Sequence, residues 1–502
     1  MMTHSENRKY GAIIGTVNML VSIAIGIVYT PLVLRFLGQS EYGVYTIASS
    51  VLSYLAMIDL GFGNALIRYS ARFRAENKDD KDINGVFLLF ALFVTGAALI
   101  IGAVLGNNLE VFFGSSLSLS ESQLLVRVYR VLLYNTALTF PLSVFSSIIR
   151  SHEKFVFVNS LNFIQNILKH VAVIMFLYFG YKSEMMAVVS VVFTLIVLII
   201  EIYYTIFVIK AKFGFARLEK GLYKDIFYFS FFILLNIIVD QLYANTDKII
   251  LGKFCGSVAV SVYGIGVVFQ SYFTQFSTSI SSVFFSHMSK LSVKENGICE
   301  MSKTFNKVGR LQYMILSYIL TGFFVFGKEF ISLWAGKGYE EAYYIALIIM
   351  TPAMIPLSQN IGISILRALN RHNVRSIMYL CIAILNVFLS IPLAIKWGGT
   401  GAAIGTAIGN LLGQILFMNW YYYKKIGLDI ITYWKQVVVL SVKMIPVLLI
   451  FVLFRIIIKM DGWIGLIVKI IIAIVVSAGY YYKVILKEEK EYVDKIVNKY
   501  IR

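Results

Sequence analysis

The chain is dominated by apolar segments, each long enough to cross a lipid bilayer. A helix of about 20 apolar residues spans a hydrocarbon core of about 30 Å. We count fourteen such segments, and they begin near Gly11, Tyr42, Asn84, Leu124, Phe155, Met185, Ile226, Val258, Val308, Tyr344, Ser376, Gly401, Gln436 and Ile464. This pattern predicts an all-α polytopic membrane protein with about 14 transmembrane helices.

Composition and charge agree with this class and predict an orientation. Only 14% of the residues are charged and 59% are hydrophobic, whereas soluble proteins carry about 25% charged residues. With a cytoplasmic N-terminus, 30 of the 45 basic residues fall in cytoplasmic segments and 7 in external ones. Because Lys and Arg collect on the cytoplasmic side, both termini are predicted to be cytoplasmic. The net charge of +18 therefore reflects topology and does not indicate a nucleic-acid partner.

Motifs of enzymes and of cofactor binding are missing from the sequence. It contains no phosphate-binding loop, no zinc-protease motif and no nucleophile elbow. Its three cysteines are far apart, so no disulfide framework or metal site is predicted. We expect a protein that is not an enzyme and that needs no cofactor.

An internal repeat divides the chain into lobes. Three short patterns recur in the same order: residues 34–46 in 251–264, 141–150 in 356–367, and 161–162 in 385–386. Each repeat holds six segments, so the two halves share one orientation and a site between them is expected. We predict an N-terminal lobe over residues 1–210, a C-terminal lobe over 211–425, and two further helices with a cytoplasmic tail over 426–502.

Basic and amide side chains within the apolar segments are the main candidates for substrate binding. Ionisable residues inside a bilayer cost roughly 2.5–3.5 kcal/mol each on insertion scales and usually face a water-filled interior. Arg127 and Arg130 share one helical face; they either line a cavity or extend to the external surface.

A polar stripe follows in the next apolar segment. Asn159, Asn162, Asn166 and Lys169 recur at steps of three and four on one helical face. We favour a cavity-lining role over simple helix packing, because a lipid-facing stripe of this kind would be expelled. Gln270 belongs to a second polar row, for which helix packing is the safer interpretation.

Acidic residues within the segments are candidates for ion coupling. Asp240 and Asp247 lie in the seventh segment, where Asp247 and Lys248 could form a structural ion pair, and Asp240 could pair with an arginine. Asp59 lies beside two glycines in the second predicted span, which covers residues 42–65, and it could balance the basic residues that follow. Lys248 also remains a candidate to contact an anionic substrate.

Three motifs stand out in the sequence: residues 34–45 read LRFLGQSEYGVY, residues 59–72 read DLGFGNALIRYSAR, and residues 245–254 read NTDKIILGKF. They resemble the bacterial polysaccharide transporters, the O-antigen and capsule repeat-unit flippases of the multidrug, oligosaccharidyl-lipid and polysaccharide exporter superfamily. The resemblance covers roughly residues 8–430. Related lipid flippases often carry a basic residue within the first span, where this chain has none.

The resemblance implies a two-lobed, MATE-like fold in the bacterial inner membrane. It also implies alternating-access movement of an undecaprenyl-diphosphate-linked oligosaccharide from the cytoplasmic to the outer leaflet. The implied partners are that glycan and membrane lipid, with a polysaccharide polymerase as a further candidate, and we expect a monomer. A diphosphate requires cations, which Arg127, Arg130, Lys169 and Lys248 could supply. An ion-coupled multidrug exporter of the same fold is the first alternative, and a membrane glycan polymerase is the second.

Overall fold

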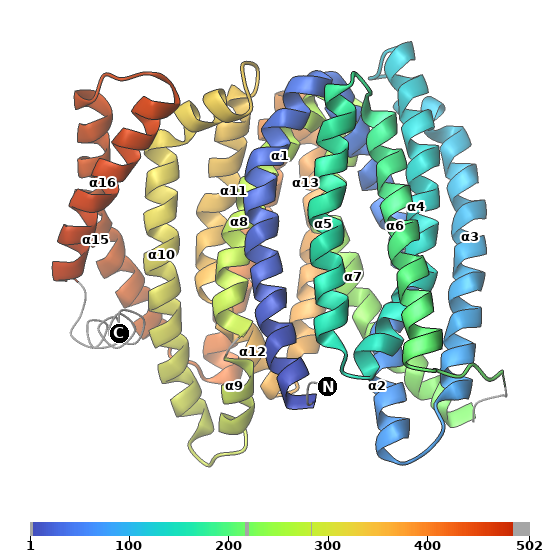
Figure 1. The fold of residues 1–502 in the computed structure, drawn as a ribbon. Helices are drawn as coiled ribbons and strands as arrows, with labels where there is room; N and C mark the ends of the chain where they lie inside the picture. Colours follow the sequence, from blue (N-terminus) through green and yellow to red (C-terminus); the bar gives the residue numbers. More distant parts are fainter. Residues whose placement is uncertain (1–3, 216–219, 283, 485–502) are drawn as a thin grey trace. The chain divides into compact units, whose positions relative to one another are not determined.

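The computed structural model describes residues 4–215, 220–282 and 284–484, and this part of the chain consists of helices joined by short turns, without strands (Figure 1). It folds as two compact units. Unit 1 comprises Met1–Gly264 with Ala383–Gly405, and unit 2 comprises Ile265–Ile382 with Thr406–Arg502. The all-α class is therefore confirmed, and the proposed lobe boundaries remain a prediction.

Unit 1 is a helical bundle built around one central helix. Its helices are α1 (His4–Leu55), α2 (Phe62–Ala75), α3 (Lys81–Phe113), α4 (Leu119–Ser151), α5 (Phe155–Tyr178), α6 (Ser183–Tyr203) and α7 (Lys220–Phe254), with a 3₁₀ turn η1 (Ala56–Asp59) and a π-helical segment η2 (Tyr204–Val208). Helix α4 packs against α1, α2, α3 and α6. In Figure 1, α3, α4, α5 and α6 run side by side, so each polar side chain on α4 faces a neighbouring helix or the bundle surface.

Two backbone breaks interrupt the N-terminal part of unit 1. Gly38 has a φ of 78°, inside the residue range of α1. Leu60 and Gly61 follow η1 with φ of 53° and 68°, which is a left-handed conformation that glycine adopts without a steric cost. The second predicted span, residues 42–65, is thus wrong as one continuous helix: it ends at Leu55, and α2 begins at Phe62. The physical reason is Gly61 in the sequence DLGFG, whose left-handed backbone permits the turn before α2.

Unit 2 contains longer and shorter helices. Its elements are α9 (Phe285–Leu291), α10 (Gly297–Trp334), α11 (Glu340–Ser358), α12 (Ile361–Ala368), η3 (Asn410–Phe417), α14 (Met418–Tyr421), η4 (Tyr422–Ile426), α15 (Ile430–Ile457) and α16 (Gly462–Val484); α8 (Gly256–Ser282) and α13 (His372–Gly409) each contribute to both units. Helix α10 packs against α11, α15 and α16. Buried Phe326, Val447, Phe451 and Leu466 form a hydrophobic cluster between α10, α15 and α16.

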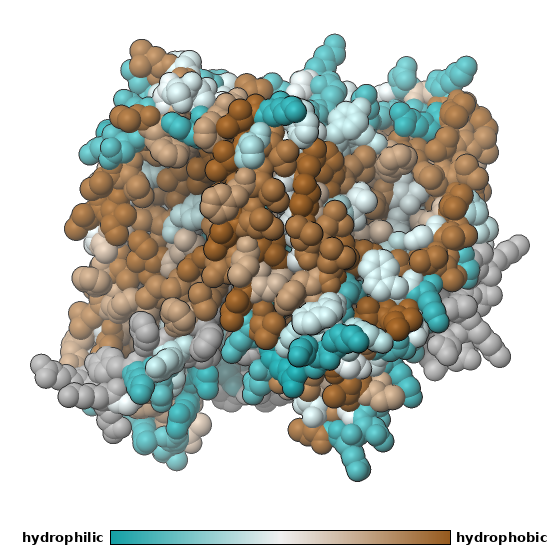
Figure 2. All heavy atoms as spheres, turned by 180° about the vertical axis from the view of Figure 1, so that it is seen from behind, coloured by the Kyte–Doolittle hydropathy of each residue, from teal (hydrophilic) through white to brown (hydrophobic). Residues whose placement is uncertain are grey.

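Eleven helical segments in the described residues are long and apolar enough to cross a membrane. Figure 2 shows hydrophobic side chains over the middle of the visible face and hydrophilic ones toward the two ends of the helices. Two of the eleven segments contain backbone breaks: Val17–Ala75 at Gly38 and again at Leu60–Gly61, and Asn373–Ile426 at Trp397–Gly398. The breaks at Gly38 and at Trp397–Gly398 each lie between two predicted spans, and fourteen remains the predicted total.

Candidate functional site

The polar stripe of α5 lies largely against α1. Asn166 donates a hydrogen bond from Nδ2 to the hydroxyl of Ser22 at 2.7 Å, and the ring of His170 meets that of Tyr29 edge-on at 4.4 Å. A Cβ on Gly15 of α1 would lie 3.5 Å from the Asn159 amide. One row of the stripe therefore packs α5 against α1, which is the alternative to cavity lining. Small and polar residues let two membrane helices approach closely.

Lys169 and Asn162 occupy the edge of this helix contact. Each follows a packed asparagine by three residues, which places it about 60° around a helix of 3.6 residues per turn. Both side chains are half-buried. Across the part of the chain that the structure describes, the Lys169 ammonium makes no ion pair and no side-chain hydrogen bond. Lys169 is therefore a cation within a membrane helix that is available to an anion.

The two arginines of α4 have different surroundings. Arg127 pairs through Nε with Oε1 of Glu184, in the first turn of α6, at 2.6 Å, and both side chains are about half exposed. Its interpretation as a surface group near the helix ends agrees with this pair. Arg130 is exposed on the same face, next to Tyr134, which is 59% exposed. Arg130 thus remains the better candidate to bind a substrate.

The polar groups of α7 form a separate cluster. Asp247 is 2% exposed and accepts a hydrogen bond from the hydroxyl of buried Tyr263 at 2.6 Å. Lys248 donates to Oδ1 of Asn245 at 3.3 Å, and Asp240 lies exposed on the same helix. The two neighbouring charges of the motif NTDK are thus each engaged with a different uncharged side chain.

Asp59 and Gln270 lie apart from these groups. Asp59 ends η1 at the break between α1 and α2, is half-buried, and has no hydrogen bond or ion pair among the residues that are described. Gln270 is in unit 2, where its Nε2 donates to Thr274 one turn further along α8 at 3.3 Å. The predicted residues are therefore distributed over several helices, and the contacts given above do not join them into one cluster.

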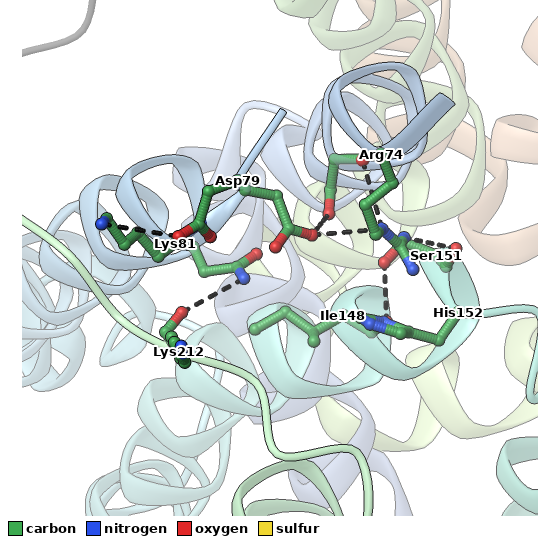
Figure 3. A network of polar contacts seen from close by, with 10 residues as sticks. Arg74, Asp79, Lys81, Ile148, Ser151, His152 and Lys212 are labelled. Atoms are coloured by element: carbon green, nitrogen blue, oxygen red, sulfur yellow. Dashed lines mark hydrogen bonds and ion pairs between the residues drawn. The ribbon is translucent and has the colours of Figure 1, made fainter. Parts of the chain in front are cut away.

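One end of unit 1 carries a network of hydrogen bonds and ion pairs between charged and polar residues (Figure 3). Arg74, near the end of α2, pairs with Asp80 at 3.2 Å and also donates to the carbonyl of Ser151 at the end of α4. His152 follows there, with Nδ1 3.0 Å from the Ile148 carbonyl oxygen. Burial lowers the pKa of His152, and the charge of Arg74 acts in the same direction. These contacts hold the ends of α2 and α4 next to the start of α3.

Two sites with a buried ionisable residue were not found from the sequence. Glu201 in α6 is 0% exposed and accepts a hydrogen bond from Ser146 of α4 at 2.6 Å. In unit 2, Lys469 of α16 is 5% exposed and pairs with Glu329 of α10 at 2.9 Å. A single charge next to an apolar run was the available sequence signal in both cases. The described residues contain no group of three or more His, Cys, Asp or Glu side chains that could hold a metal ion.

The comparisons with known proteins agree with a membrane transporter. Solved structures with a similar fold include the lipid II flippase MurJ in an inward closed conformation, with TM-score 0.72 and 17% identity over 94% of this chain and 100% of that chain. An inward-facing multidrug-resistance MATE transporter matches with TM-score 0.62 and 12% identity, covering 86% of this chain and 98% of the other. The chain thus has the fold that the MATE and MurJ structures share.

Sequence comparison identifies the family. Residues 32–344 match the polysaccharide biosynthesis protein family, and the chain belongs to this family. A putative O-antigen transporter of Shigella flexneri is 23% identical over 396 residues, which are 77% of this chain and 91% of the relative. These relatives and structural neighbours are transporters and flippases, and none is an enzyme. The resemblance seen in the sequence motifs is therefore confirmed.

Proposed function

We propose that this protein is a flippase of the bacterial inner membrane. It moves undecaprenyl-diphosphate-linked oligosaccharide repeat units from the cytoplasmic to the outer leaflet, for the synthesis of surface polysaccharide. The observation that carries the proposal is the family match over residues 32–344, which the O-antigen transporter relative supports. The N- and C-termini are cytoplasmic in this proposal, and the protein acts as a monomer by alternating access between the lobes 1–210 and 211–425.

Cations of unit 1 bind the diphosphate in this proposal. A diphosphate inside a membrane protein requires charge-assisted hydrogen bonds from Lys or Arg. Lys169 is half-buried and has no side-chain partner among the described residues, and Arg130 is exposed on the face of α4. Arg127 and Lys248 are weaker candidates, since Glu184 and Asn245 already engage them.

Amide side chains contact the glycan in this proposal. Asn162 lies beside Lys169 at the edge of the α1–α5 contact, and Asn166 could exchange its bond to Ser22 for one to a sugar hydroxyl. Gln270 contributes from unit 2. Among the acids proposed for ion coupling, Asp59 is a better candidate than Asp247, whose carboxylate Tyr263 already contacts; Asp240 remains a third candidate.

Deletion of the gene in its native host tests the proposal. We expect prenyl-diphosphate-linked repeat units to accumulate on the cytoplasmic side, and the wild-type gene to reverse this. Arg130→Ala and Lys169→Ala should fail to rescue, whereas Lys459→Ala, at an exposed lysine between α15 and α16, should rescue fully. Rescue by both Arg130→Ala and Lys169→Ala would leave the flippase proposal standing and refute the assignment of these two cations to the substrate site.

Normal surface glycan without accumulation would refute the flippase proposal and favour a multidrug exporter. That alternative rests on the MATE-like fold and predicts greater drug sensitivity of the deletion strain. Loss of polymer with normally translocated single repeat units would favour the polymerase.

A further inference from the structure

The contact between α4 and α6 encloses an acidic group that the proposed substrate site does not use. Glu201 lies two residues before the end of α6, inside the candidate span Ser183–Val208, and its side chain is 0% exposed. Ser146 of α4 donates to Oε2 at 2.6 Å. Oε1 accepts no hydrogen bond from any residue that is described. An acidic oxygen fully enclosed without a donor is a rare feature, since buried polar atoms are normally paired.

A second oxygen without a partner lies four residues further along the chain. Thr205, at the start of η2, is 0% exposed, and its Oγ1 makes no hydrogen bond within the described ranges. Residues four apart share one face of a helix. Thr205 therefore lies on the same side of this segment as Glu201, and their two unpaired oxygens make no hydrogen bond with each other. The surroundings of Glu201 thus contain a second buried oxygen without a partner among the described residues.

The charged groups around Glu201 are few. From α4, the Arg150 guanidinium is the charge that acts on this carboxyl. From α5, the Phe157 ring stacks on Tyr204 of η2 at 3.7 Å between centroids. Helix α1 meets α6 near Val189, about three turns before Glu201. An ionised carboxylate would thus have one cation, at the end of α4, to balance it.

The backbone next to Glu201 is also unusual. The α-helix changes to the π-helical segment η2 at Tyr204, and π-helical turns often occur at functional sites. A wide turn is easier to rearrange than a regular α-helix, because its backbone hydrogen bonds are less well aligned. The acid therefore lies beside a part of α6 that can change conformation.

We propose that Glu201, with Ser146, is a proton-binding site that controls the packing of α4 against α6. With a proton on Oε1 the group is neutral and stabilises the closed contact. When the proton leaves to water, the carboxylate charge is left in an apolar contact, where burial is costly. The contact then opens, or Arg150 turns toward the carboxylate. A proton is preferred over sodium because a single carboxylate supplies too few oxygens for a closed metal site.

Infrared difference spectroscopy on the full-length protein in lipid nanodiscs tests the site without any substrate. We expect wild type to show the carbonyl stretch of a protonated carboxylic acid, which disappears as the buffer is made alkaline. Glu201→Gln should lose this band, and Glu201→Asp should shift it. Glu110→Gln removes an exposed carboxyl on α3 and should leave the band unchanged. A band that persists in Glu201→Gln would overturn the proposal.

A further variant keeps the test valid if Glu201→Gln fails to fold. Ser146→Ala keeps the acid but removes its hydrogen-bond partner, so it should shift the band. Absence of a shift would overturn the role of Ser146 in the site. A band that sodium ions remove at constant pH would overturn the proton assignment in favour of a metal ion.

The consequence for transport rests on the proposed function and has a separate readout. Translocation of the lipid-linked glycan in membrane vesicles should depend on pH in wild type and lose that dependence in Glu201→Gln. If the infrared band behaves as expected but the deletion strain accumulates no glycan, the proton site stands and the flippase proposal fails. If the glycan accumulates but the band is absent, the flippase proposal stands and the proton site fails.

Discussion

Two sites with a buried ionisable residue, one in each unit, are stabilised in different ways. Glu329 of unit 2 meets the ammonium of Lys469 at 2.9 Å, and Lys469 is 5% exposed. Glu201 of unit 1 is 0% exposed and meets only the hydroxyl of Ser146 among its hydrogen-bond partners. The first acid has a full counter-charge that joins α10 to α16, whereas the second has one hydrogen bond that joins α6 to α4.

This difference separates a structural charge from an exchangeable one. Removing one member of a buried ion pair leaves an uncompensated charge, which is strongly unfavourable. A carboxyl that is held only by a hydroxyl has no fixed counter-charge, so its ionisation in an apolar contact is costly and changes the packing around it. We therefore assign the Glu329–Lys469 pair to the attachment of α16, and Glu201 to regulation.

The largest expected effect is at the ion pair. Glu329→Met should lower the free energy of unfolding by about 3–5 kcal/mol, because it leaves the buried ammonium of Lys469 without its partner. Thermal unfolding in detergent measures this loss. Lys459→Met, at an exposed site, serves as the control. The double variant Lys469→Met with Glu329→Met should recover most of the loss; no recovery would show that packing, and not charge, accounts for the effect.

A smaller loss is expected when the donor to Glu201 is removed. Ser146→Ala should destabilise the protein by about 1–3 kcal/mol, the range for a buried polar group left without its partner. The same unfolding assay, with Ser115→Ala at an exposed position as control, measures it. Equal melting temperatures for the two variants would mean that the α4–α6 hydrogen bond contributes nothing to stability.

Among the variants at these two sites, Glu201→Gln should change the free energy of unfolding least. Glu201→Gln keeps an acceptor for Ser146 and removes the charge, so we expect unfolding free energies within about 1 kcal/mol of wild type. Glu329→Gln, which leaves Lys469 without a counter-charge, should cost far more under the same conditions. If the two variants were equally destabilised, the distinction between the two acids would be refuted.

The contribution of His152, the residue that follows α4, to stability depends on pH. Its folded-state pKa lies below the usual value of about 6.5 because of burial. The unfolded chain therefore binds a proton first as the pH falls. The contribution of His152 to stability is full above the unfolded pKa and is lost as the pH drops through the folded pKa. His152→Gln should reduce the fall in melting temperature between neutral and mildly acidic buffer; an unchanged fall would exclude His152 as its cause.

Local patterns in the sequence identified much of the candidate site but not its pairings. The stripe on α5 follows from helical periodicity alone, and Lys169 was found in this way. The contact of Asn166 with Ser22 could not be predicted, because 144 residues separate the two in the chain. Glu201 was missed for the same reason: its donor lies 55 residues away on another helix, and in the sequence it reads as a charge that closes an apolar run.

The sequence by itself determined the all-α membrane class, the family and the approximate positions of the membrane helices, since each depends on composition, periodicity or short motifs. Tertiary structure alone decided which charges are compensated. Helical periodicity specifies the face on which a side chain lies, but the helix that covers that face is specified by packing between distant segments. Glu201 and Lys469 each read in the sequence as a single charge within an apolar run, and only the helices packed against them make one a proposed proton site and the other half of an ion pair.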